Sequence, residues 1–174
     1  MAMPVWVLLD LSASMGFEGA QRKLDVLADL TESLAWSVWR TGDSFGFVGC
    51  DESVQPGFTQ PQTRSRGAGM ALAQRLRTLV PKGRSARALR EAHRHLPRQR
   101  ALVFLVSDFH LPLAELDVVL DSLASHDVVP IVLWQPAEFA LSATRGLAQV
   151  REPETGAQRW LWWRPALRER WAAA

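Results

Sequence analysis

The feature that most constrains the fold is a continuous apolar run at residues 5–9, which ends in a carboxylate. The run has the length of a strand and is rich in β-branched and large residues, which is typical of a strand buried on both faces. Asp10 follows at once, and Ser12 and Ser14 come at alternate positions after it. A carboxylate at the C-terminal end of such a strand lies where open α/β folds place their binding sites. The three side chains are either oxygen ligands for a hard cation such as Mg²⁺ or helix N-caps, and this stretch alone favours neither.

A second apolar run, residues 101–106, repeats this pattern and ends in Ser107 and Asp108. The carboxyl ends of parallel strands meet at one edge of a sheet, so Asp108 can lie beside Asp10. Mg²⁺ prefers oxygen ligands, commonly one or two carboxylates together with waters and other groups. Two matching strand ends therefore favour a shared metal site over two carboxylates that cap separate helices.

The rest of the chain alternates between helical and strand patterns, which is typical of a mostly parallel sheet covered on both faces. We expect an α/β fold in one domain that spans residues 1–174. A polar, glycine-rich stretch at 60–69 predicts a mobile loop. The expected helices are 21–40, 70–80, 85–96, 113–125, a short one at 138–141 and a closing one at 165–171. The expected further strands are 45–50, a short edge strand at 53–59, 128–134, and 148–152 with 159–163 as a hairpin or a final strand with a loop.

Composition narrows the class of protein. The chain has 174 residues and a formal net charge of +2, which is too small to indicate nucleic-acid binding by itself. Its single cysteine, Cys50, excludes an internal disulfide framework and fits a reducing compartment. The apolar run at 5–9 is too short for a signal peptide or a membrane span. We therefore expect a cytoplasmic protein with no membrane segment in this chain.

The motif Asp10-Leu11-Ser12-Ala13-Ser14 resembles the DxSxS signature of von Willebrand factor A domains, and Ser107-Asp108-Phe109 is similar to their later aspartate element. The resemblance is closer to one branch, the bacterial proteins known as domain of unknown function fifty-eight, which are commonly encoded next to MoxR-type AAA+ ATPases. Thr41-Gly42-Asp43 and Pro153-Glu154-Thr155-Gly156 resemble this branch as well, so the likeness spans nearly the whole chain.

The resemblance implies a Rossmann-like von Willebrand factor A fold with a metal-ion-dependent adhesion site (MIDAS). Asp10, Ser12 and Ser14 would hold Mg²⁺ (or Mn²⁺ or Ca²⁺), and Asp108 would join them directly or through water. The family's loop threonine has no counterpart here; Ser85 is the nearest candidate and would be a fifth group. We expect three residues next to these motifs to contact the partner: Met15, Phe109 and His110.

The implied function is binding, not catalysis: an acidic residue of a partner protein, an AAA+ ATPase or its client, would complete the metal's coordination during assembly or maturation of the client. Ser12 and Ser14 have no obvious paired histidine, so nucleophilic catalysis is unsupported. One alternative is a Mg²⁺-dependent phosphohydrolase with Asp10 as nucleophile, although Ser12 stands where a second acid is expected. Another is a scaffold domain that binds no metal.

Overall fold

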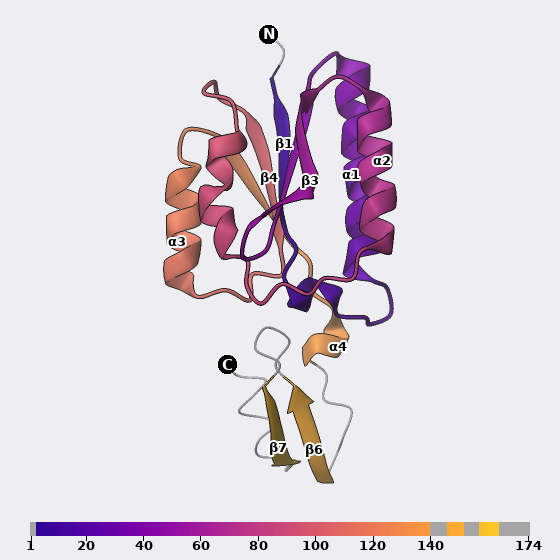
Figure 1. Ribbon diagram of the computed structural model, residues 1–174, viewed down its shortest axis with the longest axis vertical. Coiled ribbons are helices and arrows are strands. Elements are labelled where there is room, and N and C mark those ends of the chain that lie inside the picture. The colour runs from indigo at the N-terminus through magenta and orange to yellow at the C-terminus, as the bar shows by residue number, and fades with distance from the viewer. Residues whose placement is uncertain (1–2, 140–145, 152–156, 164–174) are drawn as a thin grey trace.

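The computed structural model describes residues 3–139, 146–151 and 157–163, and its centre is a five-stranded sheet (Figure 1). The strands lie in the order β3-β2-β1-β4-β5. β1 pairs in parallel with β2 and β4, β4 pairs in parallel with β5, and β3 joins β2 antiparallel. Their bounds are β1 Val5–Asp10, β2 Phe45–Cys50, β3 Val54–Thr63, β4 Leu102–Ser107 and β5 Asp127–Val132. The expected mostly parallel sheet is confirmed, and the apolar run at 5–9 forms its central strand.

Alternate residues of β1 supply two hydrophobic cores, one on each face of the sheet. Val7 and Leu9 pack on the side of α1 (Lys23–Thr41) and α2 (Arg66–Thr78). Trp6 and Leu8 pack on the other side, against residues of the 3₁₀ helix η2 (Arg87–His95) and of α3 (Leu113–Ser122). Figure 1 shows α1 and α2 on one side of the sheet and α3 on the other. A central strand buried on both faces has to be apolar throughout, which explains the run.

The carboxyl ends of β1 and β4 meet at one edge of the sheet, where the candidate site lies. After β1 the chain turns through the 3₁₀ helix η1 (Ala13–Gly16) and then enters α1 at Lys23. After β5 it forms the one-turn helix α4 (Pro136–Phe139), which Figure 1 places beneath this edge. Segments distant in sequence therefore border the same edge.

One sequence prediction on this part of the chain is wrong. The stretch 60–69 is not a loop, because β3 continues to Thr63 and α2 begins at Arg66. Edge strand β3 is only partly buried, so it lacks the apolar pattern that marks a strand, and it pairs with β2 through two register shifts. The expected helix at 85–96 is present as the 3₁₀ helix η2.

The C-terminal part forms a separate antiparallel pair, β6 (Gly146–Arg151) and β7 (Gln158–Trp163). The hairpin alternative is therefore the observed one, and it makes a two-stranded sheet of its own. The expected closing helix at 165–171 and the turn at 153–156 lie outside the described residues. In the part of the chain that the structure describes, none of the helices has the length and apolar character needed to cross a membrane.

Candidate functional site

The turn after β1 brings the motif's oxygen atoms together. The Ser12 backbone N–H donates to Asp10 Oδ1 at 2.8 Å, which folds the chain back over the carboxylate. Ser12 also forms a parallel bridge with Gly83, and the Ala13 N–H donates to the Gly83 carbonyl at 2.7 Å. The loop before η2 is thus fixed beside the motif, although it lies some seventy residues away in sequence.

The side-chain oxygens of Asp10, Ser12 and Ser14 have the spacing of a cation-binding group. Ser12 Oγ lies 2.6 Å from Asp10 Oδ1 and 3.1 Å from Ser14 Oγ. Neighbouring oxygens around an octahedral Mg²⁺ with bonds of about 2.1 Å are about 3 Å apart. A carboxylate with two hydroxyls is also the hard oxygen donor set that Mg²⁺ or Ca²⁺ prefers. The residues present therefore fit such an ion.

Ser107 belongs to the support of this group. It ends β4, and its hydroxyl donates to Asp10 Oδ2 at 2.6 Å while accepting the Phe109 N–H at 2.8 Å. Both oxygens of Asp10 are thus engaged by hydroxyl or amide groups. This supporting role of Ser107 was not predicted. Its position directly before Asp108, at the end of a buried strand, could have indicated that its hydroxyl lies at the site.

Burial leaves the charge of Asp10 poorly compensated. The residue is 2% exposed, and this desolvation raises its pKa above the ordinary value. Hydrogen bonds from Ser107 and Ser12 act in the opposite direction, whereas the nearby charge of Asp108 raises the pKa further. A cation bound here would favour the ionised form of Asp10, so the electrostatics suit a metal ligand.

Asp108 lies at the same edge but is bound to a lysine. Its Oδ2 accepts a hydrogen bond from Lys23 Nζ at 3.0 Å, and the same ammonium lies 2.7 Å from Glu138 Oε2 and 3.3 Å from the Ser14 carbonyl. All three charged side chains are buried, with exposures of 1% for Lys23 and Asp108 and 7% for Glu138. The sequence did not predict this ammonium. Lys23 lies four residues before Leu27, a fully buried residue, and that helical spacing was the available signal.

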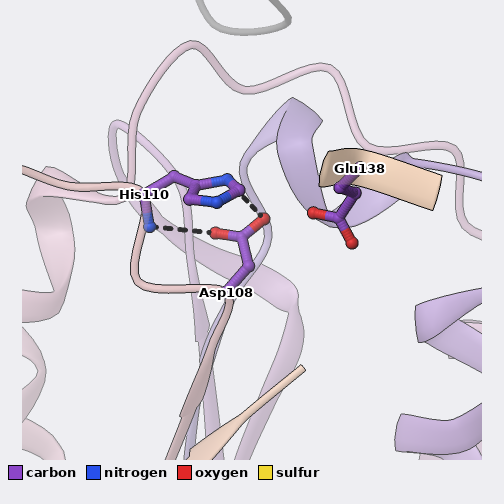
Figure 2. A group of neighbouring side chains, drawn as sticks. All are labelled: Asp108, His110 and Glu138. Atoms are coloured by element: carbon purple, nitrogen blue, oxygen red, sulfur yellow. Dashed lines mark hydrogen bonds and ion pairs between the residues drawn. The ribbon is translucent and has the colours of Figure 1, made fainter. Parts of the chain in front are cut away.

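Figure 2 shows Asp108, His110 and Glu138 gathered at this edge. One ligand atom from each lies within 4.8 Å of the others. His110 Nδ1 is 3.5 Å from Asp108 Oδ2, and the backbone N–H of His110 donates to Asp108 Oδ1 at 3.2 Å. Phe109 adopts a φ of 56°, a left-handed conformation that is uncommon for a large side chain, and so turns the chain sharply back toward Asp108.

The remaining predicted site residues differ in their placement. Ser85 lines a cavity of about 180 Å³ together with Asp10, Ser12 and His110, so the loop after Gly83 brings this residue to the site. His110 is exposed and Phe109 half-buried, so both have surface at the rim. Met15 has no exposed surface because it packs in the core beneath η1, so we do not carry its partner-binding role forward.

Comparison with known proteins places the whole chain in one family. Residues 1–174 match the family described as protein of unknown function DUF58. An uncharacterized protein in the moxR 3' region of Paracoccus denitrificans is 40% identical over 78 residues, which are 45% of this chain and 70% of that protein.

Two solved structures share the fold at low identity. An aerotolerance-related membrane protein from Bacteroides fragilis, carrying multiple mutations to serines, has a TM-score of 0.61 at 16% identity over 99% of this chain and 87% of its own. The conserved hypothetical protein BatB from Bacteroides thetaiotaomicron has a TM-score of 0.61 at 17% identity over 91% of this chain and 75% of its own. The expected α/β fold, a mostly parallel central sheet with helices on both faces, is confirmed.

Proposed function

This chain belongs to the DUF58 family, and we propose that it is a metal-ion-dependent protein-interaction domain. The observation that carries the proposal is the spacing of the Asp10, Ser12 and Ser14 oxygens, 2.6 and 3.1 Å apart at the carboxyl edge of β1. These three side chains would hold Mg²⁺, or Mn²⁺ or Ca²⁺, with Ser85 as a further oxygen from the neighbouring loop. A bound ion would supply a positive centre with a coordination position for an outside oxygen ligand.

The chemistry of the site selects an acidic partner group. Asp10 contributes the only negative charge among the three motif ligands, so a divalent ion there would keep part of its charge. Arg84 and Glu115 line the same cavity as Asp10 and Ser85, so fixed charges of both signs lie beside the site. A carboxylate of a partner protein would complete the coordination of the ion and would also pair with Arg84.

We take the partner to be a MoxR-type AAA+ ATPase or its client. The relative from Paracoccus denitrificans is named for its position in the moxR 3' region, and this supports a functional link for the present chain. In this proposal the domain recognises the ATPase or the client through the metal, and His110 and Phe109 at the rim contribute contacts beside it.

The experiment is a pull-down from the native cell with tagged wild type, Asp10→Asn and the matched control Asp43→Asn, each with and without chelator. We expect the MoxR-type ATPase or its client, identified by mass spectrometry, with the wild type and the control. Chelation or Asp10→Asn should reduce recovery about tenfold, and Mg²⁺ should restore the chelated wild type. Equal recovery under all conditions would remove the metal from the interaction.

Two alternatives lead to different results. In a phosphohydrolase, Asp10 would attack phosphorus, yet its oxygens accept hydrogen bonds from Ser12 and Ser107 and the residue is 2% exposed. Mg²⁺-dependent turnover of a generic phosphate ester that disappears in Asp10→Asn would replace the binding proposal. A scaffold domain would show no heat of binding with millimolar Mg²⁺ or Mn²⁺.

A further inference from the structure

The carboxyl edge of the sheet already contains a buried cation, the ammonium group of Lys23. The chain has two lysines, and they differ sharply: Lys82 is exposed, whereas Lys23 is 2% exposed. Moving an ammonium group from water into an interior is costly unless it is paired and hydrogen-bonded. Lys23 meets this condition through Asp108, Glu138 and the Ser14 carbonyl.

The ammonium of Lys23 lies beside the DxSxS motif, where a metal would bind. Its contact with the Ser14 carbonyl places it directly beside the motif, and its contact with Asp108 engages the aspartate that the resemblance assigns to the metal. Two like charges near one carboxylate repel each other, so full occupancy by both is unfavourable. The ammonium and a divalent ion are therefore rivals for Asp108.

We infer that Lys23 is a resident cation that competes with the divalent ion for Asp108 and couples occupancy of the site to α4 through Glu138. The inference rests on the proposed metal-dependent function and adds its regulation. Without metal, Lys23 bridges Asp108 and Glu138 and closes the edge. With metal, Asp108 turns to the ion, and the bridge from Lys23 to Glu138 is loosened.

The contacts of α4 give this exchange a path to the surface. Glu138 Oε1 accepts the Gln135 N–H at 2.6 Å, and the Trp134 indole donates to the Asp108 carbonyl at 2.6 Å. A shift of Asp108 or Lys23 therefore acts on Trp134 and Gln135, in the segment that joins β5 to α4. Figure 1 shows α4 below the carboxyl edge of the sheet, so the exchange would alter how α4 is presented to a partner.

Mn²⁺ titration by calorimetry tests the competition with the whole chain and no partner. We compare wild type, Lys23→Met and the matched control Lys82→Met. Removing the rival charge should lower the Kd for Mn²⁺ about tenfold or more in Lys23→Met, and Lys82→Met should stay within about twofold of wild type. A merely structural role for Lys23 predicts the reverse, weaker binding by a disturbed site. Equal or weaker binding by folded Lys23→Met would overturn the inference.

If Lys23→Met does not fold, acylation of the wild type tests the competition between Lys23 and the metal ion. A succinimidyl ester should modify Lys82 much faster than Lys23, and millimolar Mn²⁺ should raise the Lys23 rate while leaving that of Lys82 unchanged. A Lys23 rate that does not respond to Mn²⁺ would refute the exchange. Neither measurement involves the ATPase, so failure of the proposed partnership is observed separately, in the pull-down.

Discussion

Replacing Lys23 with methionine should destabilise the metal-free protein severely. The change keeps a flexible side chain of similar length but removes the cationic partner of Glu138, and it leaves that carboxylate and Asp108 facing each other in a buried site. Breaking a buried ion pair from one side typically costs about 3–5 kcal/mol, because the remaining charge is left uncompensated. That is a large part of the total stability of about 5–15 kcal/mol expected for a domain.

The loss is measurable by urea or thermal unfolding in the presence of chelator. For a chain of this size, about 3–5 kcal/mol corresponds to a fall in Tm of about 6–20 °C. Lys82→Met is the matched control, since exposed substitutions usually change stability by less than about 0.5 kcal/mol. The double variant Lys23→Met/Glu138→Gln should regain part of the loss, because it removes one of the two opposed carboxylates.

Two results would refute this reasoning. If the free energy of unfolding of Lys23→Met is within about 1 kcal/mol of the wild-type value, the ammonium contributes no more stability than an exposed ion pair does. The buried bridge would then not be what stabilises this edge of the sheet. If Glu138→Gln adds its full cost to that of Lys23→Met, the two side chains are not coupled, and α4 is attached by other contacts.

Three further predictions concern other groups. Burial raises the pKa of the Cys50 thiol to about 12 from 9.0, so at pH 8 the thiolate fraction of Cys50 should be about a thousandfold lower than that of an ordinary cysteine. A disulfide reagent should therefore label Cys50 rapidly only in urea, and rapid labelling of the native chain would contradict this. Burial also raises the pKa of Asp10, so its carboxyl group keeps its proton to higher pH in the folded state than in the unfolded state. Without metal, the free energy of unfolding should therefore fall as pH rises from below about 4, and this pH-dependent contribution should vanish in Asp10→Asn. An added Cβ at Gly46 would lie 2.6 Å from three carbons of the Trp6 indole, so Gly46→Ala should cost about 1–3 kcal/mol in urea unfolding, and a neutral substitution would show that the ring can move away.

The strands at the centre of the sheet were predictable because burial on both faces requires apolar residues. The runs at 5–9 and 101–106 became β1 and β4, and their ends supplied Asp10 and Asp108 at one edge. A continuous apolar run is its own signal, since it needs no knowledge of the neighbouring strands.

The start of α2 was missed because its glycines were interpreted as loop residues. Gly69 lies inside α2 and faces Ala35 of α1, where a side chain would collide with the Ala35 methyl group. Glycine here permits close approach of two helices, a use that sequence alone does not distinguish from a turn.

Lys23 and Glu138 were not foreseen because their role depends on tertiary contact. They are 115 residues apart, and in the sequence each resembles an ordinary surface charge. The side of α1 that Lys23 occupies indicated burial, but which carboxylates would meet it depends on where α4 returns to the sheet. The clustering of the motif's oxygens was local and predictable, whereas the ammonium of Lys23 beside them was not.

The outer strand β5 has a consequence for association between molecules. Among the described strands it forms one border of the main sheet, and Val129 and Val132 are exposed on it. A strand of another molecule can pair with the free backbone groups of such an edge strand. Pro130 sits in the middle of β5 and has no N–H to offer, so the row of donors that an added strand needs is interrupted. A proline that resembles a flaw in the strand pattern therefore protects the protein against edge-to-edge aggregation.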